Sequence, residues 1–223
     1  MSDQARSRVD RFLGKLATEL PRRGNLIFAL DATVSRKPTW DAACQLQARM
    51  FQEVVTIGTL SMQLVYYRGP AGLGGECKAS RWLDKPIDLA GLMGRITCEA
   101  GHTQIGKVLT HVRQEATLRK INAMVFVGDA CEEGPDHLIQ KAAHLGRIKV
   151  PAFMFQEGQD PEAQKVFQEI ARLTGGAYHR FDQGSVSQLG ELLKAVAMFS
   201  VGGAAALERQ GSTAAKRLLA QVS

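Results

Sequence analysis

Five oxygen-bearing side chains, spread over three short segments of the sequence, have the chemistry to hold a metal ion. They are Asp31, Thr33, Ser35, Thr103 and Asp129. Two carboxylates and three hydroxyls, with no sulfur among them, form the kind of ligand set that hard divalent cations prefer. The sequence therefore predicts a divalent-cation site, for Mg²⁺ or alternatively for Mn²⁺ or Ca²⁺.

Two of the three segments follow a largely apolar run of strand length. Residues 25–30 precede Asp31, and residues 123–128 precede Asp129. An apolar run that ends at once in an acidic residue is typical of a buried parallel strand with a polar group at its carboxyl end. Ligands bind at that edge in open α/β sheets, so both carboxylates are expected at a ligand-binding edge.

These segments resemble the metal-ion-dependent adhesion site of the von Willebrand factor type A (VWA) domain family. The family pattern is Asp-x-Ser-x-Ser, then a Thr, then an Asp after the next strand. Here Thr33 replaces the first Ser, and Gly-Asp-Ala at 128–130 replaces the usual Thr-Asp-Gly. Residues 101–106 resemble the Gly-Gly-Thr-x-Ile-Gly form, and residues 170–178 resemble the turn before the family's last strand. The resemblance covers about residues 24–200 and indicates an intracellular, bacterial-like member with a near-complete site.

The resemblance implies a role for each residue of the set. Thr33 and Ser35 bind the metal directly in this scheme, and Thr103 binds it directly or through water. Asp31 and Asp129 act largely through water. The remaining position takes a Glu or Asp from a protein partner, which is recognition rather than catalysis. Intracellular relatives work beside AAA+ ATPases or in stress-response complexes, although no residue here identifies such a partner.

An enzyme of a different class is the main alternative. The segment after the first strand also resembles the phosphorylated Asp loop of haloacid-dehalogenase-like phosphohydrolases, in which Asp31 is the nucleophile and Asp129 a Mg²⁺ ligand. Thr33 stands where that family has its acid–base Asp, which argues against this alternative. Lys107 and Lys141 are the lysines that remain to stabilise a transferred phosphoryl group. A third alternative is a domain with a degenerate metal site that binds partners by other surfaces.

Single residues of the set also have ordinary structural explanations. Asp31 could close a strand and cap a turn, and Thr103 could be the N-cap of the following helix. Glu132 and Glu133 are expected only to raise the local negative potential, and His102 is expected to face solvent. A zinc site built from a cysteine pair and a histidine lacks the usual ligand spacing, although Cys98 and His102 lie close in sequence.

Regular alternation of apolar runs and helical patterns predicts the fold class. A doubly wound, mostly parallel six-stranded sheet with helices on both faces follows, as in a Rossmann-like VWA fold with one short antiparallel edge strand. If the family topology holds, the first and fourth strands are neighbours. Strands are expected at 25–31, 61–67, 76–79, 122–128, 150–155 and 177–181, and helices at 5–20, 40–54, 87–96, 104–119, 135–146, 161–173 and 185–199.

Three parts are expected along the chain. Residues 1–23 form an N-terminal amphipathic helix, residues 24–200 the VWA domain, and residues 201–223 a tail that is either helical or disordered. After Pro38, Thr39 is expected to be the N-cap of a helix with Asp41 in its first turn.

Composition limits the class of protein further. The 223 residues are 45% hydrophobic, as in globular proteins. The sequence contains no run of eighteen apolar residues, so no membrane span is expected. The polar start lacks the apolar core of a signal peptide, and four scattered cysteines without a Cys-x-x-Cys pair fit reduced thiols, so a cytoplasmic protein is expected. The net charge of +6 comes partly from basic ends, but the one aromatic residue among them, Phe12, does not form the interleaved pattern that supports base stacking, so nucleic-acid binding is not favoured.

Overall fold

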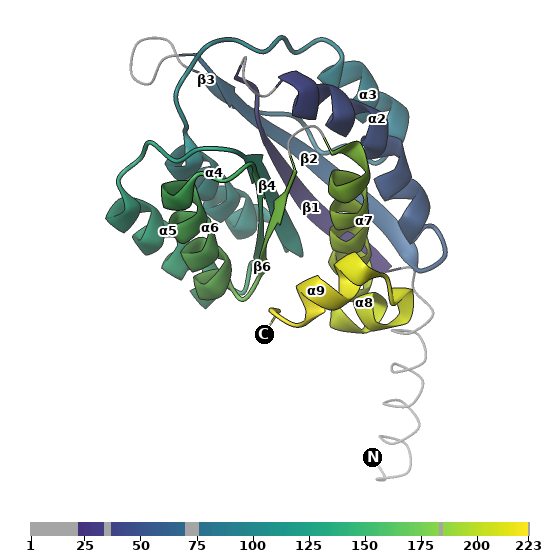
Figure 1. The fold of residues 1–223 in the computed structure, drawn as a ribbon. Helices are drawn as coiled ribbons and strands as arrows, with labels where there is room; N and C mark the ends of the chain where they lie inside the picture. Colours follow the sequence, from purple (N-terminus) through teal and green to yellow (C-terminus); the bar gives the residue numbers. More distant parts are fainter. Residues whose placement is uncertain (1–21, 34–36, 70–75, 183–184, 223) are drawn as a thin grey trace.

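A single twisted sheet forms the centre of the molecule (Figure 1). The computed structural model describes residues 22–33, 37–69, 76–182 and 185–222. The strands have the order β3-β2-β1-β4-β5-β6, and neighbours are parallel except for the β2–β3 pair, which is antiparallel. The prediction of a doubly wound, mostly parallel sheet is therefore confirmed. The strands are β1 (Arg22–Asp31), β2 (Gly58–Arg68), β3 (Glu76–Ala79), β4 (Ala123–Gly128), β5 (Ala152–Glu157) and β6 (Ala177–Phe181).

Helices cover both faces of this sheet. One face carries α2, α3, α7, α8 and α9, and the other carries α4, α5 and α6 (Figure 1). Each face has its own hydrophobic core, because successive side chains of a strand point to opposite faces. The helices are α2 (Lys37–Val54), α3 (Pro86–Met93), α4 (Ile105–Leu118), α5 (Pro135–Arg147), α6 (Pro161–Thr174), α7 (Val186–Gly202), α8 (Ala204–Gln210) and α9 (Thr213–Leu219).

The alternation is clearest in β1, which is buried on both faces. Leu26, Phe28 and Leu30 belong to the core under α2 and α7. Ile27 and Ala29 belong to the core under α4 and α5. A near-continuous apolar run is what a central parallel strand requires, and this explains why the sequence located β1 correctly.

Several element boundaries differ from the predicted ones. Strand β1 begins at Arg22 and not at residue 25, because Arg22, Arg23 and Gly24 pair with the start of β2. Strand β5 ends at Glu157 and not at residue 155. Helix α2 begins at Lys37, which places Thr39 inside its first turn. The predictions of Thr39 as N-cap and of an acidic residue in the first turn were therefore wrong.

The structure tests the prediction for the C-terminal end of the chain but not the one for the N-terminal end. The expected helix at 5–20 lies outside the described residues. In the tail, α8 and α9 pack on the same face as α7, and the side chains of Leu207 and Leu218 are buried there. Within the described ranges, no helix combines the length and the apolar character needed to cross a membrane.

Candidate metal-binding site

The predicted site lies where the sheet reverses its strand order. The chain moves from β1 outward to β2 and β3, and then returns to β4 on the other side of β1. Leu30 of β1 pairs with Val127 of β4, so Asp31, the last residue of β1, and Asp129, directly after β4, lie at the ends of adjacent parallel strands. This is the topological switch point, where ligands bind in open α/β sheets. The expectation that the first and fourth strands are neighbours is confirmed.

The first segment of the site is held in a tight turn. Asp31 is only 4% exposed, and its Oδ1 accepts a hydrogen bond from the Thr33 amide at 2.7 Å. An Asp side chain that bonds the amide two residues on fixes a local turn. Thr33 is also buried, whereas Ser35 lies outside the described residues.

Backbone hydrogen bonds join this turn to the loop that carries Thr103. The Ala32 amide donates to the Tyr67 carbonyl oxygen at 3.0 Å, and the Glu99 amide donates to the Ala32 carbonyl oxygen at 3.0 Å. Arg68 holds the same loop from β2, since its guanidinium donates to Thr97 Oγ1 at 2.8 Å and pairs with Glu99 at 2.8 Å. Arg68 could not be identified from the sequence, because its hydrogen bond to Thr97 crosses 29 positions of the chain.

Thr103 is bound to the loop after β4 by a reciprocal pair of hydrogen bonds. Its amide donates to Glu132 Oε2 at 2.8 Å, and its Oγ1 accepts from the Glu132 amide at 3.0 Å. Thr103 is buried, and the N-cap residue of α4 is Gln104. The simpler explanation of Thr103 as a helix N-cap is therefore wrong. Its hydroxyl keeps one proton and one lone pair after accepting a single bond.

Glu133 caps α4 instead. Its carboxylate accepts hydrogen bonds from the amides of Ile105 and Gly106, the second at 3.0 Å. A Cβ on Gly106 would lie 2.9 Å from Glu133 Oε2, so the glycine permits this approach. Burial raises the pKa of Glu133 despite these two bonds. The expectation that Glu132 and Glu133 only raise the negative potential was wrong, because both connect the loop after β4 to the Thr103 segment.

Negative charge is concentrated around one buried hydroxyl at this edge. Burial first, and then the carboxylates of Asp31, Asp129 and Glu133, hold the pKa of Tyr67 well above its usual range. The carboxylates that end β1 and β4 thus lie close enough to act on one side chain. Several carboxylates in a partly buried environment favour a bound cation, because a cation offsets their mutual repulsion.

A buried acidic residue that the sequence reasoning missed ends the next strand. Glu157 is 2% exposed at the end of β5, and its Oε2 accepts a hydrogen bond from the hydroxyl of Thr39 in α2. The signal was similar to that for Asp31, an acidic residue near the end of an apolar run, although Gln156 stands between the run and Glu157. It was missed because β5 was expected to end at Phe155.

The chemistry of the donor set fits a hard cation. Asp31, Thr33, Thr103 and Asp129 offer oxygen atoms only. Among the residues with described positions, no group of three or more His, Cys, Asp and Glu side chains is arranged to hold a metal. The zinc alternative therefore gains no support, whereas the predicted set has only two carboxylates and does not depend on such a group. His102 bonds Glu132 Oε2 at 3.1 Å from an exposed position.

Comparisons with known proteins identify the fold. No protein-family model and no curated protein matches the sequence. An aerotolerance-related membrane protein from Bacteroides fragilis is 15% identical with a TM-score of 0.56, over 74% of this chain and 95% of that one. The SpRpn10 VWA domain is 8% identical with a TM-score of 0.58, over 75% of this chain and 94% of that domain. The vWF domain of the pilus tip protein Mfa5 from Porphyromonas gingivalis is 8% identical with a TM-score of 0.57, over 80% and 95%.

The fold of this chain is therefore that of VWA-type domains. At these identities the likeness concerns the fold alone, and it agrees with the strand order and the parallel pairing described above. It lends no support to the phosphohydrolase alternative.

Proposed function

We propose that this protein is a metal-dependent protein-interaction module. A divalent cation, Mg²⁺ first and Mn²⁺ or Ca²⁺ as alternatives, binds at the carboxyl edge between β1 and β4. The observation that supports this most is the placement of Asp31 and Asp129 at the ends of two adjacent strands at the switch point of a VWA-type sheet. Thr103 reaches the same edge through its bonds to Glu132.

Asp31, Thr33, Ser35, Thr103 and Asp129 hold the cation in this proposal. When bound, it supplies a positive centre with one position open to a carboxylate oxygen of the partner. The residues of this chain orient that position. The turn between Asp31 and Thr33 fixes the first segment, and the Thr103–Glu132 pair fixes the second.

The charges around the site define the chemistry of the partner. Glu133 occupies the amides of Ile105 and Gly106 at the start of α4, so this helix end does not attract a partner carboxylate. Glu132 is half exposed at the rim and repels acidic segments. A single projecting Glu or Asp therefore fits better than an acidic tail. An AAA+ ATPase or a stress-response complex is the first class of partner to test, and the cytoplasm remains the predicted compartment.

A hydrolytic enzyme is the less favoured function. Lys107 Nζ donates to Gln104 Oε1 at 2.7 Å, and Lys141 donates to the hydroxyl of Thr110. Neither bond involves Asp31, where a phosphoryl group would be transferred. We expect no turnover of a generic phosphoester such as p-nitrophenyl phosphate with Mg²⁺. Turnover that Asp31→Asn abolishes would favour the enzyme instead.

A pull-down in Mg²⁺ and in EDTA tests the interaction. Asp129→Ala and EDTA should each weaken retention of the partner. Asp136→Ala is the matched control, because Asp136 is an exposed carboxylate in the first turn of α5 and belongs to no part of the proposed site. Binding that persists in EDTA and in Asp129→Ala, but is lost on charge reversal of Arg6, Arg8 and Arg11, would place the interface elsewhere. This result would contradict the proposal.

A further inference from the structure

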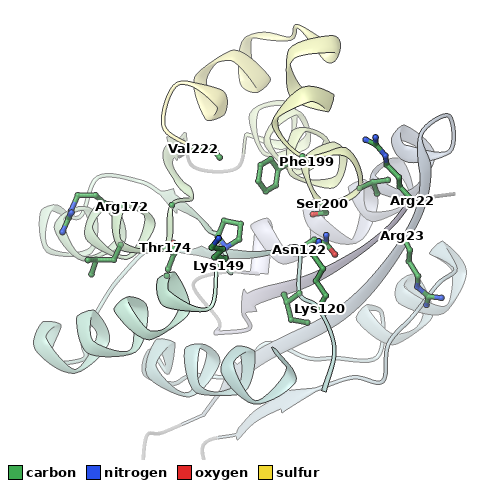
Figure 2. Close-up of a pocket in the computed structure, with 17 residues that line it drawn as sticks. Arg22, Arg23, Lys120, Asn122, Lys149, Arg172, Thr174, Phe199, Ser200 and Val222 are labelled. Carbon is green, nitrogen blue, oxygen red and sulfur yellow. The ribbon is translucent and has the colours of Figure 1, made fainter. Parts of the chain in front are cut away.

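A pocket lies at the edge of the sheet opposite the proposed metal site. Figure 2 shows the residues that line it. The pocket has a volume of about 850 Å³ and lies among the starts of β1, β4 and β5 and the ends of α5, α6 and α7. Pockets of roughly 300–1,000 Å³ are the usual size for small-molecule ligands. Nothing in the proposed interaction function uses this pocket.

All charged residues that line the described part of this pocket are basic. Figure 2 shows three arginines around the rim with side chains that extend outward, whereas Lys149 lies near the middle. Two of the three arginines are already paired, Arg23 with Asp84 at 2.8 Å and Arg172 with Glu169 at 2.6 Å. Within the described ranges, neither Lys120 nor Lys149 has an ion pair. The charged lining residues are Arg22, Arg23, Lys120, Lys149 and Arg172.

The backbone at Lys149 is in a conformation that lysine rarely adopts. Its φ is 57°, and Lys149 has the one positive φ outside glycine among the described residues. Lys149 follows the end of α5. Its amide donates a hydrogen bond to the Gly146 carbonyl oxygen at 3.0 Å, and the Val150 amide donates one to the Leu145 carbonyl oxygen at 3.0 Å. This is the Schellman motif, in which the left-handed position is usually glycine.

The neighbouring helix ends in the same motif with the usual residue. After α6, Gly175 has a φ of 69°, and the amides of Gly175 and Gly176 bond carbonyl oxygens of the last turn at 3.3 and 2.9 Å. Both helix ends line the pocket. A lysine where glycine would be less strained indicates that the side chain is kept for a function, because strained backbone tends to occur at functional sites.

Favourable helix-dipole interactions do not fully explain these lysines. Cations near a helix C-terminus offset its partial negative charge. In α5, His144 and Arg147 already lie in the last turn, and Arg172 does so in α6. Lys149 comes after these residues, and the carbonyl ends beside it would oppose an anion unless further cations were present.

The remaining wall combines an apolar surface with an amide. Phe199 is partly exposed to the pocket, and its other contacts include an edge-on packing against Phe153 at 5.1 Å between ring centroids. The Oδ1 of Asn122 accepts a hydrogen bond from the Asn25 amide at 2.9 Å. The side-chain NH₂ of Asn122 takes no part in that bond and is a hydrogen-bond donor. Figure 2 shows Phe199 and Asn122 among the residues that surround the hollow.

We propose that this pocket binds a small organic phosphate of about nucleotide size, with its phosphate near Lys120 and Lys149 and an apolar ring against Phe199. Lysine binds phosphate as a compact point charge, and two of the three arginines at the rim are already paired with carboxylates. The volume exceeds what inorganic phosphate needs and leaves room for the ring.

Titration with AMP tests this binding, with adenosine and inorganic phosphate as probes that each carry one half of the chemistry. Backbone amide NMR signals of Asn122, Lys149 and Gly175 should shift with AMP, and both half-probes should bind more weakly. Lys149→Gln should weaken AMP about tenfold, as expected for the loss of one charge-assisted contact. The control Lys165→Gln removes an exposed lysine that pairs with Glu162 on α6, and it should leave the affinity unchanged.

The Lys149→Gly variant distinguishes the effect of the side chain on ligand binding from the effect of the backbone conformation on stability. It relieves the left-handed strain, so the melting temperature should rise by about 2–4 °C while AMP affinity falls. Unchanged AMP affinity in both Lys149 variants would overturn the proposal. So would adenosine binding as tightly as AMP, or binding of an acidic peptide or RNA without any binding of AMP. None of these outcomes bears on the metal site, because the two sites lie at opposite edges of the sheet.

Discussion

Thr103 and Glu132 hold each other across the ends of two loops. The Thr103 amide donates to the Glu132 carboxylate at 2.8 Å, and the Glu132 amide donates back to the Thr103 hydroxyl at 3.0 Å. One exposed acidic residue thus sets the position of one buried hydroxyl. The proposed metal ligand Thr103 is therefore oriented by a residue that is not itself a proposed ligand, as is common around metal sites.

Glu132→Ala should weaken Mg²⁺ binding several-fold, because the Thr103 amide loses its carboxylate acceptor, and the backbone amide of residue 132 is then left as the one member of this pair that holds Thr103. The free energy of unfolding should fall by about 1 kcal/mol from the lost hydrogen bond. Calorimetric titration and urea unfolding measure the two effects. Glu208→Ala, at an exposed carboxylate of α8, is the control. Unaltered Mg²⁺ affinity in Glu132→Ala would show that Thr103 needs no such support.

Gly101→Ala should destabilise the loop that carries Thr103. A Cβ at Gly101 would lie 2.4 Å from the backbone nitrogen and oxygen of Gly69, which is too close for any side chain. Forced backbone movement should cost about 1–3 kcal/mol of unfolding free energy. Gly134→Ala is the matched control, since nothing lies within 4 Å of its added Cβ. Equal unfolding midpoints of the two variants in urea would contradict the close approach of the two loops.

Thr39 and Glu157 should be energetically coupled. Their hydrogen bond joins the first turn of α2 to the end of β5, and both side chains are buried. In a double-mutant cycle with Thr39→Val and Glu157→Gln, we expect a coupling free energy of about 1–2 kcal/mol. Additive effects of the two substitutions would mean that the bond contributes nothing to stability.

Protonation of His111 should make the protein less stable in mild acid. Burial lowers the pKa of His111 below its ordinary value of 6.5, and one ring nitrogen bonds Gln63 Oε1 at 2.8 Å. The unfolded chain then binds the proton more readily, so stability present above pH 6.5 is lost as the pH falls through the lower folded pKa. His111→Gln should flatten this part of the stability–pH curve measured by urea unfolding. If the stability–pH curve of His111→Gln has the same slope as that of the wild type, other groups cause the loss of stability in acid.

The sequence could predict the positions of Asp31 and Asp129 because the signal is local. Each acidic residue ends an apolar run, and the alternation of runs and helices implies a parallel sheet. A similar signal at Glu157, one residue beyond the apolar run, was lost through a strand boundary misplaced by two residues. Boundaries depend on pairing with neighbouring strands, as at Arg22 and Arg23, which pair with the start of β2.

Other features of the site depend on contacts between distant segments. Glu132 and Thr103 are separated by 29 positions, and only the folded chain shows that they bond each other. The capping of α4 by Glu133 has the same origin, because the usual signal for a helix start is a side chain within the helix's own first turn. The left-handed Lys149 was also hidden, since only glycine or asparagine at that position indicates the motif from sequence.

A Mg²⁺ titration of the wild type and of the Asp31→Ala, Thr103→Ala double variant tests the proposed site most directly. The melting temperature of the wild type should rise with Mg²⁺, since a ligand at ten times its Kd adds about 1.4 kcal/mol to the free energy of unfolding. The double variant should lose this response, with circular dichroism confirming that it folds. Asp129→Asn, a milder substitution, should reduce it. The control double variant Asp136→Ala, Thr117→Ala, at exposed positions, should keep it. An identical Mg²⁺ response in the wild type and the Asp31→Ala, Thr103→Ala variant would contradict the assignment of the metal site.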